Sequence, residues 1–151
     1  MNDPRQNNGA FLSLRLARVG SIMIAVPEND IMTIVDWIEP SPLPFAPQSV
    51  LGVVSIQGRM FTVLDTARLL EVDLEIQGPI VALRGPEQLA LTVDAAGELF
   101  QISGDKVRPA TDFTSVSKGT MDRDGITVHL VATQNLFAAT LQGHERRRRR
   151  F

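Results

Sequence analysis

The chain has 151 residues, enough for one domain with a substantial core or for two small half-domains that share one. It contains no cysteine, which excludes disulfides and thiolate chemistry and is compatible with a reducing cytosol. Five of the 15 basic residues form the run 146–150 and all 17 acidic residues precede it, so residues 1–145 carry a net charge of −7. This acidic body argues against a specific nucleic-acid surface, because phosphate binding needs a positive face.

The first part of the chain predicts short strands joined by turns. Residues 11–16 alternate apolar and polar side chains, and residues 21–26 are rich in β-branched side chains, so we expect a hairpin through residues 17–20. A turn at 27–30 leads to a half-buried strand at 31–38. A stiff extended connection then follows, because four prolines stand close together: Pro40, Pro42, Pro44 and Pro47.

The segment 46–70 carries the clearest local pattern. Two apolar runs, 50–56 and 60–64, flank Gly58, which suits a tight turn that requires a positive φ. Asp65 follows the second run and can accept hydrogen bonds from the free N–H groups of a short helix at 66–70. The pattern therefore predicts a β-hairpin that leads into a capped helix.

The second part of the chain repeats this style. Strands are expected at 80–83, 88–93 and 98–102, then an extended segment at 106–113 and a hairpin at 120–131 that turns at 122–125. Many short strands, at intervals of about ten residues with turns between them, indicate a barrel or a sandwich. Helix is expected only in the capped segments that follow the hairpins.

A constant spacing of 67 residues aligns the two parts of the chain. It places like residues together: Gly52 on Gly119, Gly58 on Gly125, Val26 on Val93 and Pro42 on Pro109. Residues 22–70 and 89–137 are therefore interpreted as internal repeats that arose by tandem duplication. Each copy alone would be marginally stable, so the duplication favours one compact body over two separate beads.

Candidate catalytic and metal-binding residues are few. Histidine occurs only as His129 and His144. Ser117, His129 and Asp122 can be combined into a Ser-His-Asp set, but any sequence of this size offers such a combination. Asp122 and Asp124 faintly resemble a calcium loop whose other ligands are missing, so a hairpin turn explains them better. We therefore expect no catalytic residue, no metal and no cofactor.

The two ends of the chain differ from its body. Residues 1–10 are polar, and no apolar segment approaches the roughly 18 residues that span a bilayer, so neither a secreted precursor nor a membrane span is expected. Residues 140–151 are interpreted as a basic, disordered and solvated tail without a specific nucleic-acid partner. The folded domain is expected over residues 11–139.

The motif VLGVVSIQGRMFTVLD, preceded by PLPFAP, resembles the CheW-like family, the coupling proteins of bacterial chemotaxis arrays. The matching positions are Ala46, Pro47, Leu51, Gly52, Val53, Gly58, Val63, Leu64 and Asp65. The resemblance extends from Phe11 to Phe137. It implies a mainly β fold in which two SH3-like five-stranded β-barrels pack together, with short helices after the hairpins.

The resemblance also implies a function. Members of that family are cytoplasmic, non-enzymatic adaptors that link the cytoplasmic tip of a chemoreceptor to the regulatory domain of a CheA-like histidine kinase. One barrel offers an apolar edge to the kinase, and the groove between the barrels takes a receptor helix. The partner-binding positions implied here are Ile31, Ile34, Val54, Ile56, Gln57 and Gly58. Ile31 and Ile34 are equally well explained as core residues.

One departure from the family pattern affects this function. The family turn Asn-Leu-Arg-Gly is Ser55-Ile56-Gln57-Gly58 here, so neutral Gln57 replaces an arginine and an ion pair is lost at that corner. Two alternatives remain open. One is a CheW-like adaptor of a type IV pilus or gliding kinase pathway with a changed receptor surface. The other, from a different class, is a small-molecule hydrolase built on a β-barrel.

Overall fold

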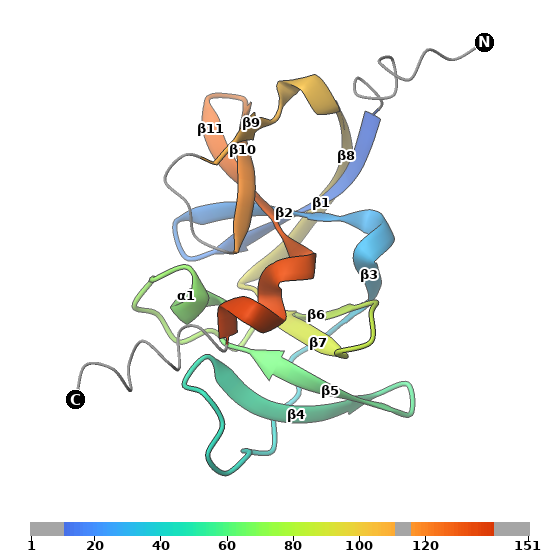
Figure 1. Cartoon of the computed structure of the whole chain (residues 1–151), viewed down its shortest axis with the longest axis vertical. Helices are drawn as coiled ribbons and strands as arrows, with labels where there is room; N and C mark the ends of the chain where they lie inside the picture. The colour runs from blue at the N-terminus through green and yellow to red at the C-terminus, as the bar shows by residue number, and fades with distance from the viewer. Residues whose placement is uncertain (1–10, 111–115, 141–151) are drawn as a thin grey trace.

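The structure is a computed structural model that describes residues 11–110 and 116–140 (Figure 1). The predictions of a disordered N-terminus at 1–10 and of a disordered tail from 141 onward lie outside the described residues. Thr140, which the sequence placed in the tail, instead lies in a helical segment at 136–140, where its buried hydroxyl donates to the Leu136 carbonyl at 2.9 Å.

The fold is mainly β and consists of two sheets packed against each other (Figure 1). The six-stranded sheet has the order β8-β1-β2-β11-β10-β9 and comprises β1 (Phe11–Val19), β2 (Ile22–Pro27), β8 (Ala95–Ser103), β9 (Arg108–Pro109), β10 (Ser117–Arg123) and β11 (Ile126–Val131). The five-stranded sheet has the order β3-β6-β7-β5-β4 and comprises β3 (Ile31–Val35), β4 (Val50–Ile56), β5 (Arg59–Leu64), β6 (Ile80–Leu83) and β7 (Leu89–Thr92).

Short helices follow the β4–β5 and β10–β11 hairpins, as predicted. After β5, Asp65 caps α1 (Thr66–Leu69), because its carboxylate accepts from the Arg68 N–H at 3.2 Å. After β11, the 3₁₀ turn η4 (Thr133–Asn135) leads into the helical segment at 136–140. Two further 3₁₀ turns, η2 (Glu28–Asp30) and η3 (Gly104–Lys106), lie outside the segments in which the sequence predicted helix.

Several strand boundaries differ from the sequence prediction, and the ends of β3 and β1 show why. β3 ends at Val35 rather than at Ile38, because its partner β6 begins at Ile80, which is paired with Val35. β1 extends to Val19, beyond the predicted end, because the turn to β2 is tight and Val19 is paired directly with Ile22. Both boundaries therefore depend on the partner strand rather than on the local apolar pattern.

Each sheet combines strands from both halves of the chain. The N-terminal hairpin β1–β2 joins the six-stranded sheet, where β1 is antiparallel to β8 and β2 is parallel to β11. In the same way, β6–β7 joins the five-stranded sheet, where β6 is antiparallel to β3 and β7 is parallel to β5. The two halves thus exchange hairpins, and neither sheet can form from one half alone.

The spacing of 67 residues recurs in the bounds of β4 and β10 and in those of β5 and β11. The N-terminal hairpins depart from it. Thr62 is paired with Leu89, and its counterpart His129 is paired with Ile24, so these hairpins are 65 residues apart. The predicted alignment of Val26 with Val93 is therefore wrong by two residues. The duplication itself remains our interpretation.

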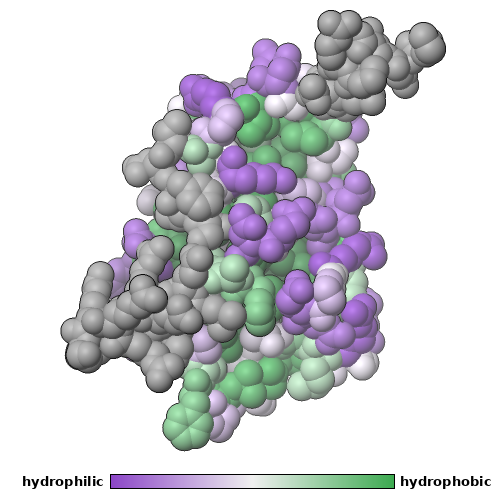
Figure 2. All heavy atoms as spheres, viewed as in Figure 1, coloured by the Kyte–Doolittle hydropathy of each residue, from purple (hydrophilic) through white to green (hydrophobic). Residues whose placement is uncertain are grey.

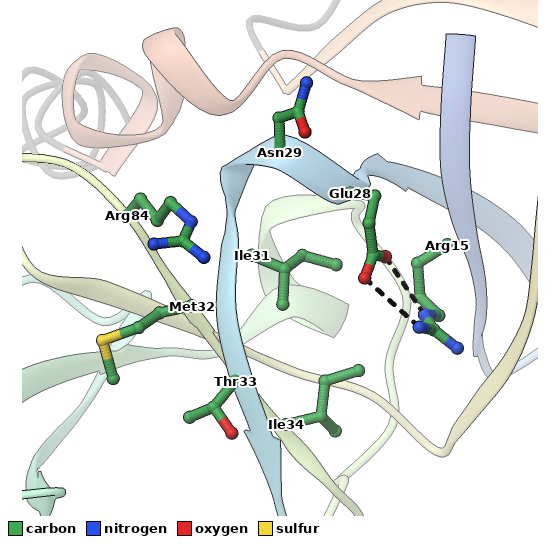
Figure 3. A pocket seen from close by; sticks show the side chains of 8 residues that line it. All are labelled: Arg15, Glu28, Asn29, Ile31, Met32, Thr33, Ile34 and Arg84. Carbon is green, nitrogen blue, oxygen red and sulfur yellow. Dashed lines mark hydrogen bonds and ion pairs between the residues drawn. The ribbon is translucent and has the colours of Figure 1, made fainter.

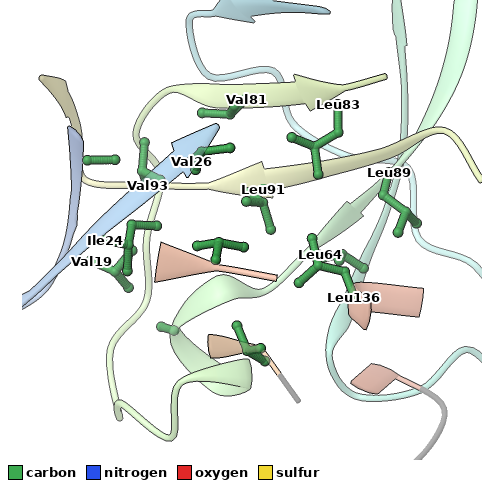
Figure 4. Packing of buried hydrophobic residues seen from close by; sticks show 14 of the residues in the cluster. Val19, Ile24, Val26, Leu64, Val81, Leu83, Leu89, Leu91, Val93 and Leu136 are labelled. Carbon is green, nitrogen blue, oxygen red and sulfur yellow. The ribbon is translucent and has the colours of Figure 1, made fainter. Parts of the chain in front are cut away.

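The buried side chains form three clusters. The largest fills the space between the two sheets (Figure 4), and its labelled members are Val19, Ile24, Val26, Leu64, Val81, Leu83, Leu89, Leu91, Val93 and Leu136. A second cluster lies within the five-stranded sheet around Phe61, with Trp37 packed against it. A third lies within the six-stranded sheet around Phe100 and Met121. The main core is therefore the interface between the sheets.

Contacts between one end strand and a strand near the opposite end show that each sheet curls on itself. In the six-stranded sheet, Arg123 of β10 donates to Glu98 of β8 at 2.9 Å, and its guanidinium carbon lies 4.2 Å from the Phe100 ring centroid. In the five-stranded sheet, Arg59 of β5 donates to the Met32 sulfur of β3 at 3.5 Å. This curvature is compatible with the expected SH3-like barrels. The sixth strand, β9, has as its counterpart an isolated bridge between Ser41 and Val53.

The glycines of β4 and β10 yield a stability prediction. A Cβ atom at Gly52 would lie 2.2 Å from the Ser41 carbonyl oxygen, and one at Gly119 would lie 2.7 Å from that of Arg108. Gly52→Ala and Gly119→Ala should each lower the free energy of unfolding by about 2–4 kcal/mol, because backbone atoms cannot move aside cheaply. Gly58→Ala, which meets open space but keeps φ at +77°, should cost only about 1 kcal/mol. Urea unfolding checks this order, and equal losses at Gly52 and Gly58 would contradict it.

Candidate protein-interaction site

A shallow groove of about 720 Å³ lies where the chain crosses from the six-stranded to the five-stranded sheet (Figure 3). The turn η2 and strand β3 form this crossing. Ile31 and Ile34 lie between Arg84 on one side and the pair of Arg15 and Glu28 on the other (Figure 3). The groove thus combines apolar side chains with charged borders.

The two arginines of the groove differ in whether a carboxylate pairs with them. Arg15 donates to both Glu28 carboxylate oxygens, at 3.3 and 3.4 Å, and also to the Gly97 carbonyl at 3.3 Å. The exposed Arg84 guanidinium has no hydrogen-bond or ion-pair partner among the residues that the structure describes. The half-buried side chains of Met32 and Ile34, beside a cation with no partner among the described residues, suit an amphipathic segment that carries an acidic residue on its flank.

The structure places the six predicted partner-binding residues in two groups. Ile31, Val54 and Ile56 are 6%, 4% and 3% exposed, so their side chains pack in the core rather than offer a contact surface. Ile34 is half-buried and lines the groove, while Gln57 and Gly58 are exposed in the β4–β5 turn. The site stays a prediction, and burial narrows the predicted residues that can meet a partner to Ile34, Gln57 and Gly58.

The turn that carries Gln57 has a defined geometry. Gln57 and Gly58 both have positive φ, at 52° and 77°, between the paired residues Ile56 and Arg59. This is the pattern of a type I′ hairpin turn, in which Asn or Asp is preferred at the first position and Gly at the second. The β10–β11 turn has the same φ values within a few degrees, with Asp in the first position. Gln57 therefore occupies a position that local preference assigns to another residue type.

Arg59 is a residue that the sequence reasoning did not identify. Its Nη1 donates to the Met32 sulfur, and its guanidinium carbon lies 5.7 Å from the Phe61 ring centroid. Because Met32 also lines the groove, this contact places the Gln57 turn beside the groove. A positive charge is therefore present at this corner two residues after Gln57. The sequence reasoning also did not identify Arg84 as a groove residue. A charged residue directly after the apolar run 80–83 is the sequence signal that could have identified it.

Two residues of the hypothetical Ser-His-Asp set, Ser117 and Asp122, make contacts with residues outside the set. The Ser117 hydroxyl donates to the Gly119 carbonyl at 3.1 Å, and the Asp122 carboxylate pairs with Arg108 at 3.3 Å. Within 11–110 and 116–140, no group of three or more His, Asp or Glu side chains is arranged to hold a metal ion. None of the helices in these ranges is long and apolar enough to cross a membrane.

Comparison with known proteins identifies the family. Residues 14–140 match the family model of the CheW-like domain. The chain belongs to the CheW-like family. It is 27% identical over 132 residues to the "Chemotaxis protein CheW" of Rhizobium meliloti (strain 1021), covering 80% of this chain and 83% of that protein. The resemblance inferred from residues 46–65 is thereby confirmed.

A solved structure supports the fold of this CheW-like chain. The scaffolding protein TtCheW from Thermoanaerobacter tengcongensis is similar to it with a TM-score of 0.77 and 15% sequence identity, over 85% of this chain and 93% of that one. The predicted mainly β fold of two packed units with short helices is confirmed by this similarity and by the two sheets described above.

The geometry of the β4–β5 turn yields a second stability prediction. Gln57→Asn should raise the free energy of unfolding by about 0.5–1 kcal/mol, because Asn tolerates the positive φ better than Gln. Asp124→Asn, at the equivalent turn position, serves as the control and should change stability little. Thermal and urea unfolding of both variants provide the measurement. A destabilised Gln57→Asn protein would contradict the turn assignment.

Proposed function

We propose that this CheW-like chain is a cytoplasmic, non-enzymatic adaptor of bacterial chemotaxis signalling. It couples the cytoplasmic tip of a chemoreceptor to the regulatory domain of a CheA-like histidine kinase. The names of its relatives, a chemotaxis protein and a scaffolding protein, support this role. The observation that carries the proposal is the groove at the crossing between the sheets, with Ile34 inside it and the Gln57 turn beside it.

The groove accounts for binding of the receptor. Its apolar part accepts the apolar face of a receptor helix, because burying that face removes apolar area from water. Arg84 is free to pair with an acidic residue on the flank of the same helix, whereas Arg15 is already neutralised by Glu28. The chemistry of the groove therefore favours an amphipathic helix with acidic residues on the side that faces Arg84.

The construction of the molecule suits an adaptor. A continuous core joins the two sheets, so a partner bound to one sheet is held at a fixed geometry relative to a partner bound at the crossing. An adaptor needs this fixed geometry and needs no reacting group. Ser117 donates to the Gly119 carbonyl and Asp122 pairs with Arg108, and these contacts give no support to the alternative of a hydrolase.

An adaptor of a type IV pilus or gliding kinase pathway is the second candidate. The observation that favours it is neutral Gln57 at the position where the resemblance implies an arginine. A contact surface that has lost this charge is expected to bind a different receptor. The two candidates are separated by titrating the full chain with purified receptor-tip fragments and kinase domains. These fragments are taken from the chemotaxis pathway and from the pilus or gliding pathway of the same organism. A chain that binds no kinase regulatory domain would exclude both.

Reversal of the Arg84 charge tests the groove. Arg84→Glu should weaken binding of a purified receptor-tip fragment by about tenfold, mainly through slower association, because an attractive charge becomes repulsive. The melting temperature should stay nearly unchanged, because Arg84 is exposed. The matched control is Arg18→Glu, an exposed arginine of β1 outside the groove. Equal effects of the two variants on receptor binding would exclude the groove as the receptor site.

The corner beside the groove is tested by restoring the arginine. Gln57→Arg should change the affinity for the receptor tip or the kinase domain, while the melting temperature stays nearly the same because both side chains are exposed and equally strained at this φ. Isothermal titration against each partner gives the affinities. Unaltered affinity for both would show that this corner takes no part in coupling.

A further inference from the structure

The segment between β3 and β4 contains a turn whose sequence opposes its geometry. In the turn of residues 43–46, the Ala46 N–H donates to the Leu43 carbonyl at 3.4 Å, Pro44 is second and Phe45 is third with φ at +63°. Pro in the second position and a positive φ in the third define a type II turn, whose third position favours Gly or Asn. A bulky aromatic residue there is a conformational outlier.

The ring of Phe45 gains nothing from the fold that would offset this strain. Phe45 is 100% exposed, and the neighbouring Leu43 is 42% exposed. Apolar atoms protrude at the end of the molecule formed by β4 and the preceding loop (Figure 2). A fully exposed phenyl ring contributes no buried area to stability, and the strained backbone that carries it lowers stability. Its role therefore lies outside the folding of this chain.

The loop that carries the ring is held rigidly at its base. Ser41 and Val53 exchange two backbone hydrogen bonds of 2.9 Å, and the Val50 N–H donates to the Pro47 carbonyl at 3.0 Å. Four prolines restrict the backbone in and around the turn. A ring presented on a stiff loop loses little conformational entropy when it enters a pocket. The turn is therefore preorganised for contact with another molecule.

We infer that the turn of residues 43–46 is a docking element, and that the Phe45 ring enters an apolar pocket on the folded regulatory domain of the kinase. This inference rests on the proposed function. The ring by itself buries only about 200 Å², far below the roughly 1,200 Å² of a stable interface. The ring can therefore anchor a larger contact with the kinase domain but cannot by itself hold two copies of this chain together.

Of the two proposed partners, the kinase domain fits the ring better. A receptor helix is convex and docks in the groove, whereas a folded domain can supply a concave pocket for a ring anchor. The exposed residues Asp36 and Glu39 precede the turn, and residues 36–49 contain no basic residue, while Arg68, which donates to Gln48 at 3.1 Å, also lies within reach of Asp65, so the rim of the pocket is expected to be neutral or basic. The turn lies at the start of β4 and Gln57 at its far end, which leaves the groove free for the receptor.

Two substitutions separate the ring from the backbone strain. Phe45→Asn removes both, so it should raise the melting temperature by about 2–4 °C and weaken binding of the kinase regulatory domain by about tenfold or more. Phe45→Ala removes the ring but keeps the strained φ, so it should weaken binding equally without the same gain in melting temperature. Ile126→Thr is the control, because Ile126 is 54% exposed on the other sheet and should alter neither quantity.

Each outcome of the titration has a definite meaning. Weaker binding of both Phe45 variants, with the control unchanged, supports the inference. If both Phe45 variants bind the kinase domain as tightly as the wild-type chain does, the inference is wrong and the proposed adaptor role stands. If the wild-type chain binds no kinase domain, both the inference and the proposed function are wrong. A lower melting temperature of Phe45→Asn would show that the ring serves the fold. Sedimentation measures self-association of the chain. If the Phe45 variants lose self-association while titration shows unchanged kinase binding, the ring contacts a second copy of this chain and the inference is wrong.

Discussion

The exchange of hairpins between the two halves of the chain is the constraint on which the rest of the structure depends. Because β2 is parallel to β11 and β7 is parallel to β5, each sheet needs strands from both halves. The apolar faces that result, with Val26 on one sheet and Leu91 on the other, meet in the largest buried cluster. Stability is therefore a property of the whole domain, and the two sheets keep a fixed relation to each other.

The fixed relation between the sheets also fixes the position of the groove. The groove lies on η2 and β3, where the chain crosses between the sheets, and Asp30 holds this crossing in place. Its carboxylate accepts from the Thr133 hydroxyl at 2.7 Å, and its carbonyl accepts from the Arg84 N–H at 2.8 Å. A segment near the C-terminal end of the domain and the loop after β6 thus both support the groove. In the proposed adaptor role, this bracing keeps the groove in a defined position relative to the rest of the domain.

Positive backbone φ values have two different explanations in this chain. Gly58 and Gly125 have positive φ because tight hairpin turns require it, and glycine meets that requirement without strain. Gln57, Phe45, Glu71 and Gln88 have positive φ although none of these residue types favours it. Gln57 and Phe45 are also exposed in turns beside the proposed interaction surfaces, where such disagreement between local preference and structure suits residues that contact other molecules.

The sequence by itself determined most of the local structure of this protein. The apolar runs 50–56 and 80–83 are strands with the predicted bounds, and Asp65 caps α1, because strands and caps depend on neighbouring residues. The motif around Gly52 and Gly58 was enough to indicate the CheW-like family. Only the tertiary structure decided which strands pair, where β3 ends, and that Ile31, Val54 and Ile56 are buried while Ile34 lines the groove. It also placed Arg59 against Met32 and left Arg84 without a partner among the described residues. These features depend on strands far apart in the chain, which local patterns do not specify.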